Sequence, residues 1–319
     1  MTFDDALRNL RGRFNFPELK PLDLKLPIDT LRSQFLKIDY SAEPDAPELA
    51  EVRPLIIRGE AGAIKARLYV PLGAGVPPGP GILFFHGGGF VLGDLDSHDM
   101  LCRRLAEGSR CRVLAIDYRL APENAFPSAH ADALAAWAWV QEKGARLAGM
   151  DPSRMAVAGD SAGGNLAAYL CQEMVRVRGP RPAFQLLLYP LLQFADIRSK
   201  KMTPQESGFF ISAGLFEFFR GHYLPDPGAF MDRRISPLFA PAEDLKGLPP
   251  AHIVLCGWDP LHDEGLAYTA KLRSLGVAVS EREYPSMMHG FLNLTHILST
   301  ARQAAREAGA AAGRALGAI

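Results

Sequence analysis

The sequence predicts an α/β fold with a mostly parallel central sheet flanked by helices. One reason is that short apolar runs of strand length alternate with segments whose apolar residues recur at helical spacing, as they do where crossover helices connect parallel strands. A second reason is that the run 81–85 is apolar throughout, as expected of a strand that helices cover on both faces. With 319 residues, 48% of them hydrophobic, the chain can also bury a sizeable core.

The expected elements follow one another from about residue 52 to the end of the chain. Strand-like runs at 53–58 and 63–70 are consistent with a hairpin-like entry into the sheet, and a loop rich in proline and glycine follows at 71–80. The other strands are expected at 81–85, 113–116, 155–159, 184–189, 251–256 and 277–284. Helices are expected at about 127–142, after Ser161 with Leu166, Leu170 and Met174 at helical spacing, at about 263–275, and in the alanine-rich tail 301–319.

Two segments do not fit this alternation. Residues 1–45 contain short helical patterns broken by prolines, as an accessory segment would. Between 190 and 251, the part 209–223 is dense in aromatic residues, and Phe216, Phe219 and Tyr223 would share one helical face. That stripe is consistent with packing into the core and equally consistent with a lid whose apolar underside faces a substrate pocket.

The composition excludes several classes of partner. Lys plus Arg and Asp plus Glu both total 35, so the formal charge is zero and binding to nucleic acid or to a membrane surface is not expected. The N-terminus does not resemble a secretory signal, and no stretch reaches the ~18 apolar residues of a membrane span, so a soluble cytoplasmic protein is expected. The sequence contains no Cys-x-x-Cys pair of the kind that forms metal or redox sites. We therefore expect free thiols packed in the core at Cys102, Cys111, Cys171 and Cys256.

The segment from Gly159 to Gly163 has the pattern of a nucleophile elbow. Ser161 stands between an apolar strand and a helical segment, with Gly159 and Gly163 two positions to either side. A serine held in a strained turn leaves no room for side chains at those two positions, so glycine is required there. Gly-x-Ser-x-Gly alone occurs by chance, but its place between a strand and a helix, with chain left for an acid and then a histidine, predicts that Ser161 is a nucleophile.

Three consecutive glycines after another strand predict a site for a negatively charged oxygen. Acyl transfer develops negative charge on a carbonyl oxygen, and backbone N–H groups aimed at it stabilise that charge. The run Gly87–Gly89 lets the main chain approach a substrate, and the N–H of Ala162, the residue after the serine, would be a further donor. His86, which precedes the glycines, is expected to organise this loop rather than to carry a proton.

A serine nucleophile needs a base that a carboxylate orients, and the order serine, acid, histidine is expected in this topology. His289 lies in a loop directly after the last strand-like run, whereas His296 lies farther along in an apolar helical segment and is expected to be structural. Asp259 closely follows the run 251–256, while Asp263 and Glu264 lie where the next helix should begin and fit the preference for acids there. The predicted catalytic residues are therefore Ser161, Asp259 and His289.

From about Pro80 to Leu292 the chain resembles the hormone-sensitive-lipase-like bacterial carboxylesterases of the α/β-hydrolase fold. The motifs that carry the resemblance are His86-Gly87-Gly88-Gly89-Phe90, Ser97-His98-Asp99, Tyr118-Arg119-Leu120-Ala121-Pro122-Glu123 with Phe126-Pro127, Gly159-Asp160-Ser161-Ala162-Gly163-Gly164-Asn165, Asp259-Pro260-Leu261-His262-Asp263-Glu264-Gly265 and His289-Gly290-Phe291. By resemblance, the triad is Ser161, Asp259 and His289, and the oxyanion donors are Gly88, Gly89 and Ala162, with Gly87 shaping the loop. The family usually has arginine where this chain has His262, which leaves the chemistry intact.

A helical cap and a dimer are two further expectations, the cap from position in the chain and the dimer from the resemblance. By position, residues 1–45 and about 193–230 are assigned to the cap, and 46–192 and 231–319 to the α/β-hydrolase catalytic domain. Under this cap, the substrate site is predicted to be lined by Phe209, Phe210, Phe216 and Phe219. Family members often form homodimers through the last strand edge, here about Val277 to Tyr284, so a homodimer is an expectation by association.

Together these features predict a serine carboxylesterase that hydrolyses short- to medium-chain esters without a metal or organic cofactor. Its partner would be a small-molecule ester. Serine at position 161 argues against haloalkane dehalogenases and epoxide hydrolases, which use an aspartate nucleophile on this fold. His289 argues against a non-catalytic receptor, which would be expected to lose the base. Amidase, thioesterase and arylformamidase activities remain alternatives, because such enzymes share the triad.

Overall fold

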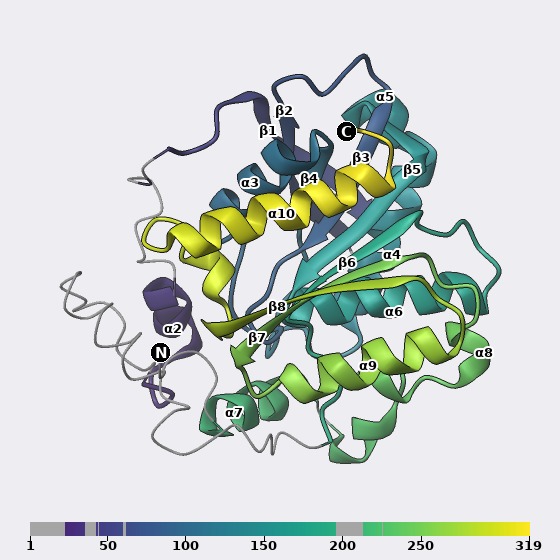
Figure 1. The fold of residues 1–319 in the computed structure, drawn as a ribbon. Helices are drawn as coiled ribbons and strands as arrows, with labels where there is room; N and C mark the ends of the chain where they lie inside the picture. Colours follow the sequence, from purple (N-terminus) through teal and green to yellow (C-terminus); the bar gives the residue numbers. More distant parts are fainter. Residues whose placement is uncertain (1–22, 36–42, 44, 60–61, 196–212, 225) are drawn as a thin grey trace.

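A computed structural model describes residues 23–35, 43, 45–59, 62–195, 213–224 and 226–319 (Figure 1). In this part of the chain an eight-stranded sheet has the order β1-β2-β4-β3-β5-β6-β7-β8. The first two pairings are antiparallel and the other five are parallel, so the predicted mostly parallel α/β sheet is confirmed. The strands are β1 (Leu49–Gly59), β2 (Gly62–Pro71), β3 (Gly79–Phe85), β4 (Arg112–Asp117), β5 (Met150–Asp160), β6 (Phe184–Leu188), β7 (Ala251–Trp258) and β8 (Val279–Met288).

Helices cover both faces of this sheet, as Figure 1 shows. One face carries α3 (Asp99–Ser109) and α10 (Ser299–Ala315), which pack against each other. The other face carries α4 (Ser128–Trp139), α6 (Ala162–Arg176) and α9 (His262–Ser274). The remaining described helices are α2 (Ile28–Phe35), α5 (Ala145–Ala148), α7 (Ala213–Tyr223) and α8 (Ala242–Leu245), with single turns η2 (Val140–Gly144), η3 (Pro227–Met231), η4 (Pro237–Phe239) and η5 (Phe291–Asn293).

The core consists of two layers, one on each face of the sheet, and β3 shows how the sequence produces them. Successive side chains of a strand point to opposite faces. Ile82 and Phe84 therefore pack with the residues of α3 and α10, whereas Leu83 and Phe85 pack with those of α4 and α6. All four are fully buried, which explains why this strand is apolar throughout.

Helix α3 is the main element that the apolar pattern did not predict. Its buried face includes Leu101 and Leu105, but also the fully buried Arg104. A charge in the apolar stripe hides the helical period, and only the folded chain supplies its partner: Arg104 donates to the buried carboxylate of Glu43. Several predicted boundaries were also wrong: β1 begins at Leu49 rather than 53, β5 begins at Met150 rather than 155, β8 ends at Met288 rather than 284 and α10 ends at Ala315 rather than 319.

Helices α2 and α7, which come from the two segments assigned to the cap, both contact the loop that follows β3. Arg32 of α2 donates to the carbonyl of Val91 at 2.9 Å, and Phe219 of α7 lies against Gly89. Figure 1 shows both helices on the side of the molecule toward which β7 and β8 point. The extent of a cap made of 1–45 and 193–230 stays a prediction.

Other sequence-based expectations have mixed outcomes in the described chain. The four cysteines are buried free thiols, as predicted. Among the helices described, none combines the length and the apolar character that a membrane crossing requires. Strand β8 stands at one end of the sheet order, so the edge invoked for a homodimer exists, and the homodimer itself stays a prediction.

Candidate active site

Ser161 lies in a sharp turn between β5 and α6. Its backbone has φ +53° and ψ −117°, a conformation that costs a non-glycine residue strain energy of order 1–3 kcal/mol. The turn is crowded: a Cβ atom on Gly163 would lie 1.9 Å from the carbonyl oxygen of Phe85, and one on Gly159 would lie 2.3 Å from the backbone of Gly163. The two glycines thus occupy the positions where the sequence required them, and the serine side chain is left at the end of the strand.

The structure brings the side chains of Ser161, His289 and Asp259 into one hydrogen-bonded chain. Nε2 of His289 lies 2.9 Å from Oγ of Ser161, and its Nδ1 lies 2.8 Å from Oδ2 of Asp259. Asp259 directly follows β7, and His289 directly follows β8. The second carboxylate oxygen, Oδ1, accepts the backbone N–H of Leu261 at 2.8 Å, which fixes the carboxylate plane. With Nδ1–H donated to Asp259, Nε2 is free to accept the serine proton.

The two acids that compete with Asp259 in the sequence are engaged elsewhere. Asp263 contacts Nδ1 of His262 at 3.1 Å. Glu264 is buried and accepts the backbone N–H of Leu192 and the side-chain amide of Gln193. Burial raises the pKa of Glu264 well above its usual value. The interpretation of Glu264 as a helix N-terminal acid was therefore incomplete, because its carboxylate also accepts hydrogen bonds from the segment that follows β6.

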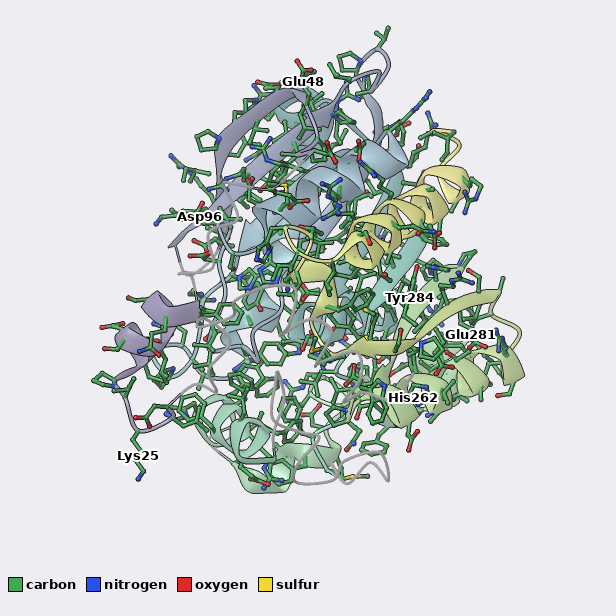
Figure 2. All side chains as sticks on the ribbon, turned by 60° about the vertical axis from the view of Figure 1, so that its left-hand side comes forward. Lys25, Glu48, Asp96, His262, Glu281 and Tyr284 are labelled. Carbon is green, nitrogen blue, oxygen red and sulfur yellow. The ribbon has the colours of Figure 1, made fainter. Side chains whose placement is uncertain are left out.

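His262, which replaces the usual arginine of the motif, lies at the beginning of α9. Its Nε2 is 3.3 Å from a carboxylate oxygen of Glu283 on β8, and its side chain is only 4% exposed. Figure 2 shows His262 below this strand, on which Glu281 and Tyr284 are also labelled. The residue thus connects α9 with β8, and it does not belong to the chain of Ser161, His289 and Asp259.

The loop after β3 contains residues 86–92, and we call it the glycine loop. Hydrogen bonds to its carbonyl oxygens fix the orientation of its peptide groups. The Gly87 carbonyl lies 2.7 Å from Nδ1 of His86, and the Gly88 carbonyl accepts the N–H groups of Val91 and Leu92. In a trans peptide the N–H points opposite to the C=O of the same unit. The N–H groups of Gly88 and Gly89 therefore point away from these partners.

His86 has the contacts expected of a loop organiser. Its ring stacks on that of Tyr118, with centroids 4.3 Å apart, and the Tyr118 hydroxyl donates to the His86 carbonyl at 2.7 Å. Burial, reinforced by the nearby His98, lowers the pKa of His86 to about 4. At neutral pH the imidazole is therefore uncharged and serves as a hydrogen-bond donor to Gly87.

Two of the four phenylalanines predicted to line the substrate site are described, and both are buried. Phe216 is 3% exposed and packs on Phe194, with ring centroids 5.5 Å apart. Phe219 is 9% exposed and lies against the glycine loop at Gly89. Phe209 and Phe210 lie outside the described residues. Of the predicted aromatic lining, Phe219 is thus the described residue that contacts the site.

The sequence model of a family described as alpha/beta hydrolase fold matches residues 82–293. The chain is 46% identical over 249 residues to the carboxylic ester hydrolase LipN of Mycobacterium tuberculosis, a match that covers 76% of this chain and 65% of that protein. It is 36% identical over 280 residues to an ethyl acetate hydrolase of Pseudomonas putida, covering 86% of each. These relatives are consistent with the motifs.

Solved structures give the same result for the fold. An ester-hydrolase from the metagenome of Lake Arreo, determined in complex with a derivative of bipyridine phosphonate, superimposes with a TM-score of 0.87 at 39% identity, covering 99% of this chain and 97% of that one. The predicted resemblance is thereby confirmed: the chain belongs to the alpha/beta hydrolase fold family, in the hormone-sensitive-lipase-like group.

Proposed function

We propose that the protein is a serine carboxylesterase that hydrolyses short- to medium-chain carboxylic esters. The observation that carries this proposal is the hydrogen-bonded chain from Ser161 Oγ through His289 to Asp259, at 2.9 and 2.8 Å. Its residue types and order are those that convert a neutral hydroxyl into a nucleophile. The relatives named carboxylic ester hydrolase and ethyl acetate hydrolase support the same reaction class.

The proposed reaction has two halves. In the first, Oγ of Ser161 bonds to the ester carbonyl carbon while its proton moves to Nε2 of His289, and the carbonyl electron pair becomes an oxyanion. The N–H groups of Gly88, Gly89 and Ala162 would bind that oxyanion. The bond to the alcohol oxygen then breaks, and His289 returns the proton to the departing alcohol.

In the second half, water replaces the alcohol. His289 takes a proton from the water while the water oxygen bonds to the acyl carbon. The bond between the acyl carbon and Ser161 Oγ then breaks, and His289 returns the proton to Oγ. Throughout, Asp259 holds the Nδ1–H tautomer and stabilises the imidazolium. Oxidation states do not change, and every proton removed is returned.

The cap would set the preferred acyl length. Each CH₂ group of the acyl chain that becomes buried gains up to ~0.8 kcal/mol until it meets the roof, after which overpacking costs more than burial returns. Phe219 is buried beside Gly89, so the roof would lie close to the reacting carbonyl. We therefore expect an optimum at roughly four to eight acyl carbons.

The experiment measures kcat/KM on aryl esters of increasing acyl length, together with an aryl amide and a thioester of matched acyl group. The proposed function predicts that esters are hydrolysed fastest and that Ser161→Ala removes turnover without loss of folding. Asp259→Asn should also be severe, because it favours the wrong tautomer of His289. A faster rate on the amide or the thioester would reassign the reaction class, and residual ester hydrolysis by Ser161→Ala above roughly 1% of wild type would exclude Ser161 as nucleophile.

A further inference from the structure

The glycine loop is held at its beginning by the residue that precedes the nucleophile. The N–H of Gly87 donates to Oδ1 of Asp160 at 2.8 Å. Asp160 is the last residue of β5 and stands directly before Ser161, and its side chain is 3% exposed. One buried carboxylate therefore connects the loop that carries the proposed oxyanion donors with the turn that carries the nucleophile.

His98 fixes that carboxylate. Its Nε2 lies 3.2 Å from Oδ1 and 3.3 Å from Oδ2 of Asp160, and its side chain is 2% exposed. Burial by itself would raise the pKa of Asp160, but the electrostatic interaction and hydrogen bond with His98, together with the hydrogen bond from the Gly87 N–H, hold that pKa below its usual value. The ionised carboxylate accepts hydrogen bonds only, so Nε2 of His98 is the donor in its contact with Asp160. The Gly87 N–H and Nδ2 of Asn293 also lie 3.3 Å from this nitrogen.

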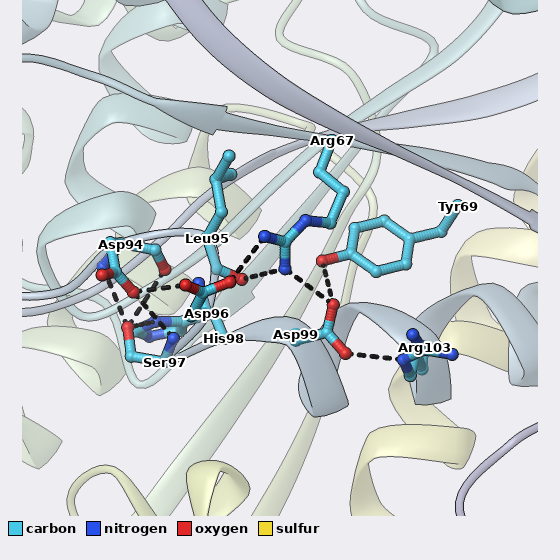
Figure 3. Close-up of polar contacts among 9 residues, drawn as sticks. All are labelled: Arg67, Tyr69, Asp94, Leu95, Asp96, Ser97, His98, Asp99 and Arg103. Carbon is cyan, nitrogen blue, oxygen red and sulfur yellow. Dashed lines mark hydrogen bonds and ion pairs between the residues drawn. The ribbon is translucent and has the colours of Figure 1, made fainter. Parts of the chain in front are cut away.

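The imidazole of His98 is oriented through its other nitrogen. Nδ1 lies 2.9 Å from Oγ of Ser97. Ser97 is held in turn by Asp94, whose backbone N–H donates to Ser97 Oγ at 2.9 Å and whose Oδ1 accepts the Ser97 N–H at 2.8 Å (Figure 3). The position of both ring nitrogens is therefore set by the surrounding protein.

The turn that carries Ser97 and His98 is attached to the sheet by Arg67 of β2. Its guanidinium donates to the Leu95 carbonyl at 3.1 Å and to the carboxylates of Asp96 and Asp99, as Figure 3 shows. These contacts keep the turn in place on both sides of Ser97. A continuous set of contacts thus extends from a strand of the sheet to the N–H of Gly87.

From this set of contacts we propose that His98 is a positioning residue for ester hydrolysis, which acts through Asp160 to hold the glycine loop where its N–H groups meet the oxyanion. The inference rests on the proposed function. Ser97, His98 and Asp160 repeat the residue types of the candidate triad, but this set of contacts ends at a backbone N–H of the loop and not at a nucleophile. Its role is therefore orientation, not proton transfer.

A positioning role has a kinetic signature. Donors aimed at the oxyanion act on charge that exists only in the transition state. A loop released from Asp160 should therefore lower kcat and weaken binding of a tetrahedral adduct, while ground-state binding, and so KM, changes little. The pH dependence of kcat/KM should keep its midpoint, because the chain of Ser161, His289 and Asp259 is not touched by the change.

The experiment compares wild type, His98→Leu, His98→Gln and the matched control His252→Leu. A Gln amide can still donate to Asp160, whereas Leu cannot. His252 also has a serine partner, with Nδ1 2.8 Å from Ser280 Oγ, but it lies at the beginning of β7, away from the ends of the strands that carry Ser161 and His289. The measurements are kcat and KM on p-nitrophenyl butyrate, Ki for an aryl-alkyl trifluoromethyl ketone, and the melting temperature.

We expect His98→Leu to lower kcat roughly 10- to 100-fold with KM within about threefold of wild type, and to raise Ki for the ketone by a similar factor. His98→Gln should recover part of both losses, and His252→Leu should change neither. A folded His98→Leu whose kcat and Ki stay within about twofold of wild type would overturn the inference. If His98→Leu does not fold, Asp160→Asn, which keeps an oxygen for Gly87 but not the charge, is judged by the same two quantities.

The two proposals fail in different ways. An inactive wild type, or a Ser161→Ala variant that still hydrolyses the ester, would remove the proposed function. An active wild type with an inactive Ser161→Ala, combined with normal kcat and Ki in His98→Leu, would leave the esterase proposal intact and overturn only the role of His98.

Discussion

The ring of Phe219 fills the place where a side chain on Gly89 would begin, because a Cβ atom at Gly89 would lie 2.3 Å from two of its ring atoms. Close by, Phe90 stacks on Tyr223 of the same helix, with ring centroids 4.0 Å apart and planes 6° from parallel. Helix α7 and the glycine loop therefore pack as one unit. A substitution in either element should therefore alter the position of the other.

Gly89→Ala should cost activity for two separable reasons. The residue has φ +62°, which disfavours alanine, and the new methyl group would collide with Phe219. Gly276→Ala is the matched control, since φ is +81° there but no atom lies within 4 Å of the added Cβ. We expect both variants to lose about 1 kcal/mol of stability from backbone strain, and only Gly89→Ala to lose kcat, roughly 100-fold. Equal activity of the two variants would show that the packing on Phe219 has no catalytic consequence.

Phe219→Ala and Phe216→Ala should differ in their effect on substrate choice. Phe219 borders the glycine loop, so its truncation should move the acyl-length optimum toward longer chains with kcat on acetate esters little changed. Phe216 is more deeply buried and packs on Phe194, so its truncation should cost about 3–5 kcal/mol of stability. Rate profiles over acyl length and urea unfolding test this pair. If Phe219→Ala lowers the melting temperature but leaves the dependence of rate on acyl length unchanged, the aromatic face of α7 belongs to the core and does not line the substrate site.

Buried histidines should make the protein less stable as the pH falls. Burial lowers the pKa of His130 to about 4, and that of His86 likewise. Between pH 6.5 and 4 the unfolded chain therefore binds protons at these positions that the folded chain does not, so the free energy of unfolding decreases through this window. The conversion of 1.36 kcal/mol per pKa unit gives a loss of roughly 3 kcal/mol for each histidine.

The test of this pH effect uses His130→Gln. His130 accepts the hydroxyl of Tyr223 at Nδ1 and donates from Nε2 to the Arg234 carbonyl, so the variant should be less stable at pH 7. Its free energy of unfolding should nevertheless fall less steeply than that of wild type from pH 6.5 to 4, measured by urea titration at each pH. Parallel curves would mean that His130 is not neutral in the folded protein.

The ion pair between Arg104 and Glu43 should be stabilising only while both partners are present. Both side chains are fully buried, and Glu43 also accepts the hydroxyl of Thr295. Removing one charge leaves the other buried without this partner, which costs about 3–5 kcal/mol, even though Arg104 also lies 3.9 Å from the carboxylate of Glu107. Arg104→Met and Glu43→Gln should each be strongly destabilising, and the double variant should lose less than the sum of the two. Additive losses in this double-mutant cycle would show that the pair is not coupled.

Local chemistry explains which parts of the fold and site could be predicted. The crowded turn around Ser161 requires glycines at fixed offsets. The loops after β5, β7 and β8 all lie at the carboxyl ends of parallel strands, so the candidate serine, acid and histidine could be predicted from their order and position. The hydrogen-bond partners of Asp160 could not be predicted in this way. His98 and Asp160 stand in separate motifs, and nothing in either motif says that one side chain holds the other.

Long-range pairing also explains the other omissions. Arg104 interrupts the apolar stripe of α3 because its partner, Glu43, comes from a distant segment. Glu264 has the position of a helix N-terminal acid, and its contacts with Leu192 and Gln193 appear only when the chain after β6 packs beside α9. Arg104 is unusual for its local pattern, and that mismatch is a signal that the sequence carries. Glu264 fits its local pattern, so the sequence carries no such signal for its contacts.

The central claim, that Ser161 forms the acyl-enzyme, is tested most directly by mass spectrometry after reaction with a p-nitrophenyl alkylphosphonate ester. Such a reagent releases nitrophenol and leaves a stable phosphonyl group on an activated serine. We predict one adduct per chain, on the peptide that contains Ser161, formed in parallel with loss of esterase activity and not formed by Ser161→Ala. Full inactivation with the adduct on another residue, or ester hydrolysis that survives complete modification of Ser161, would contradict the account.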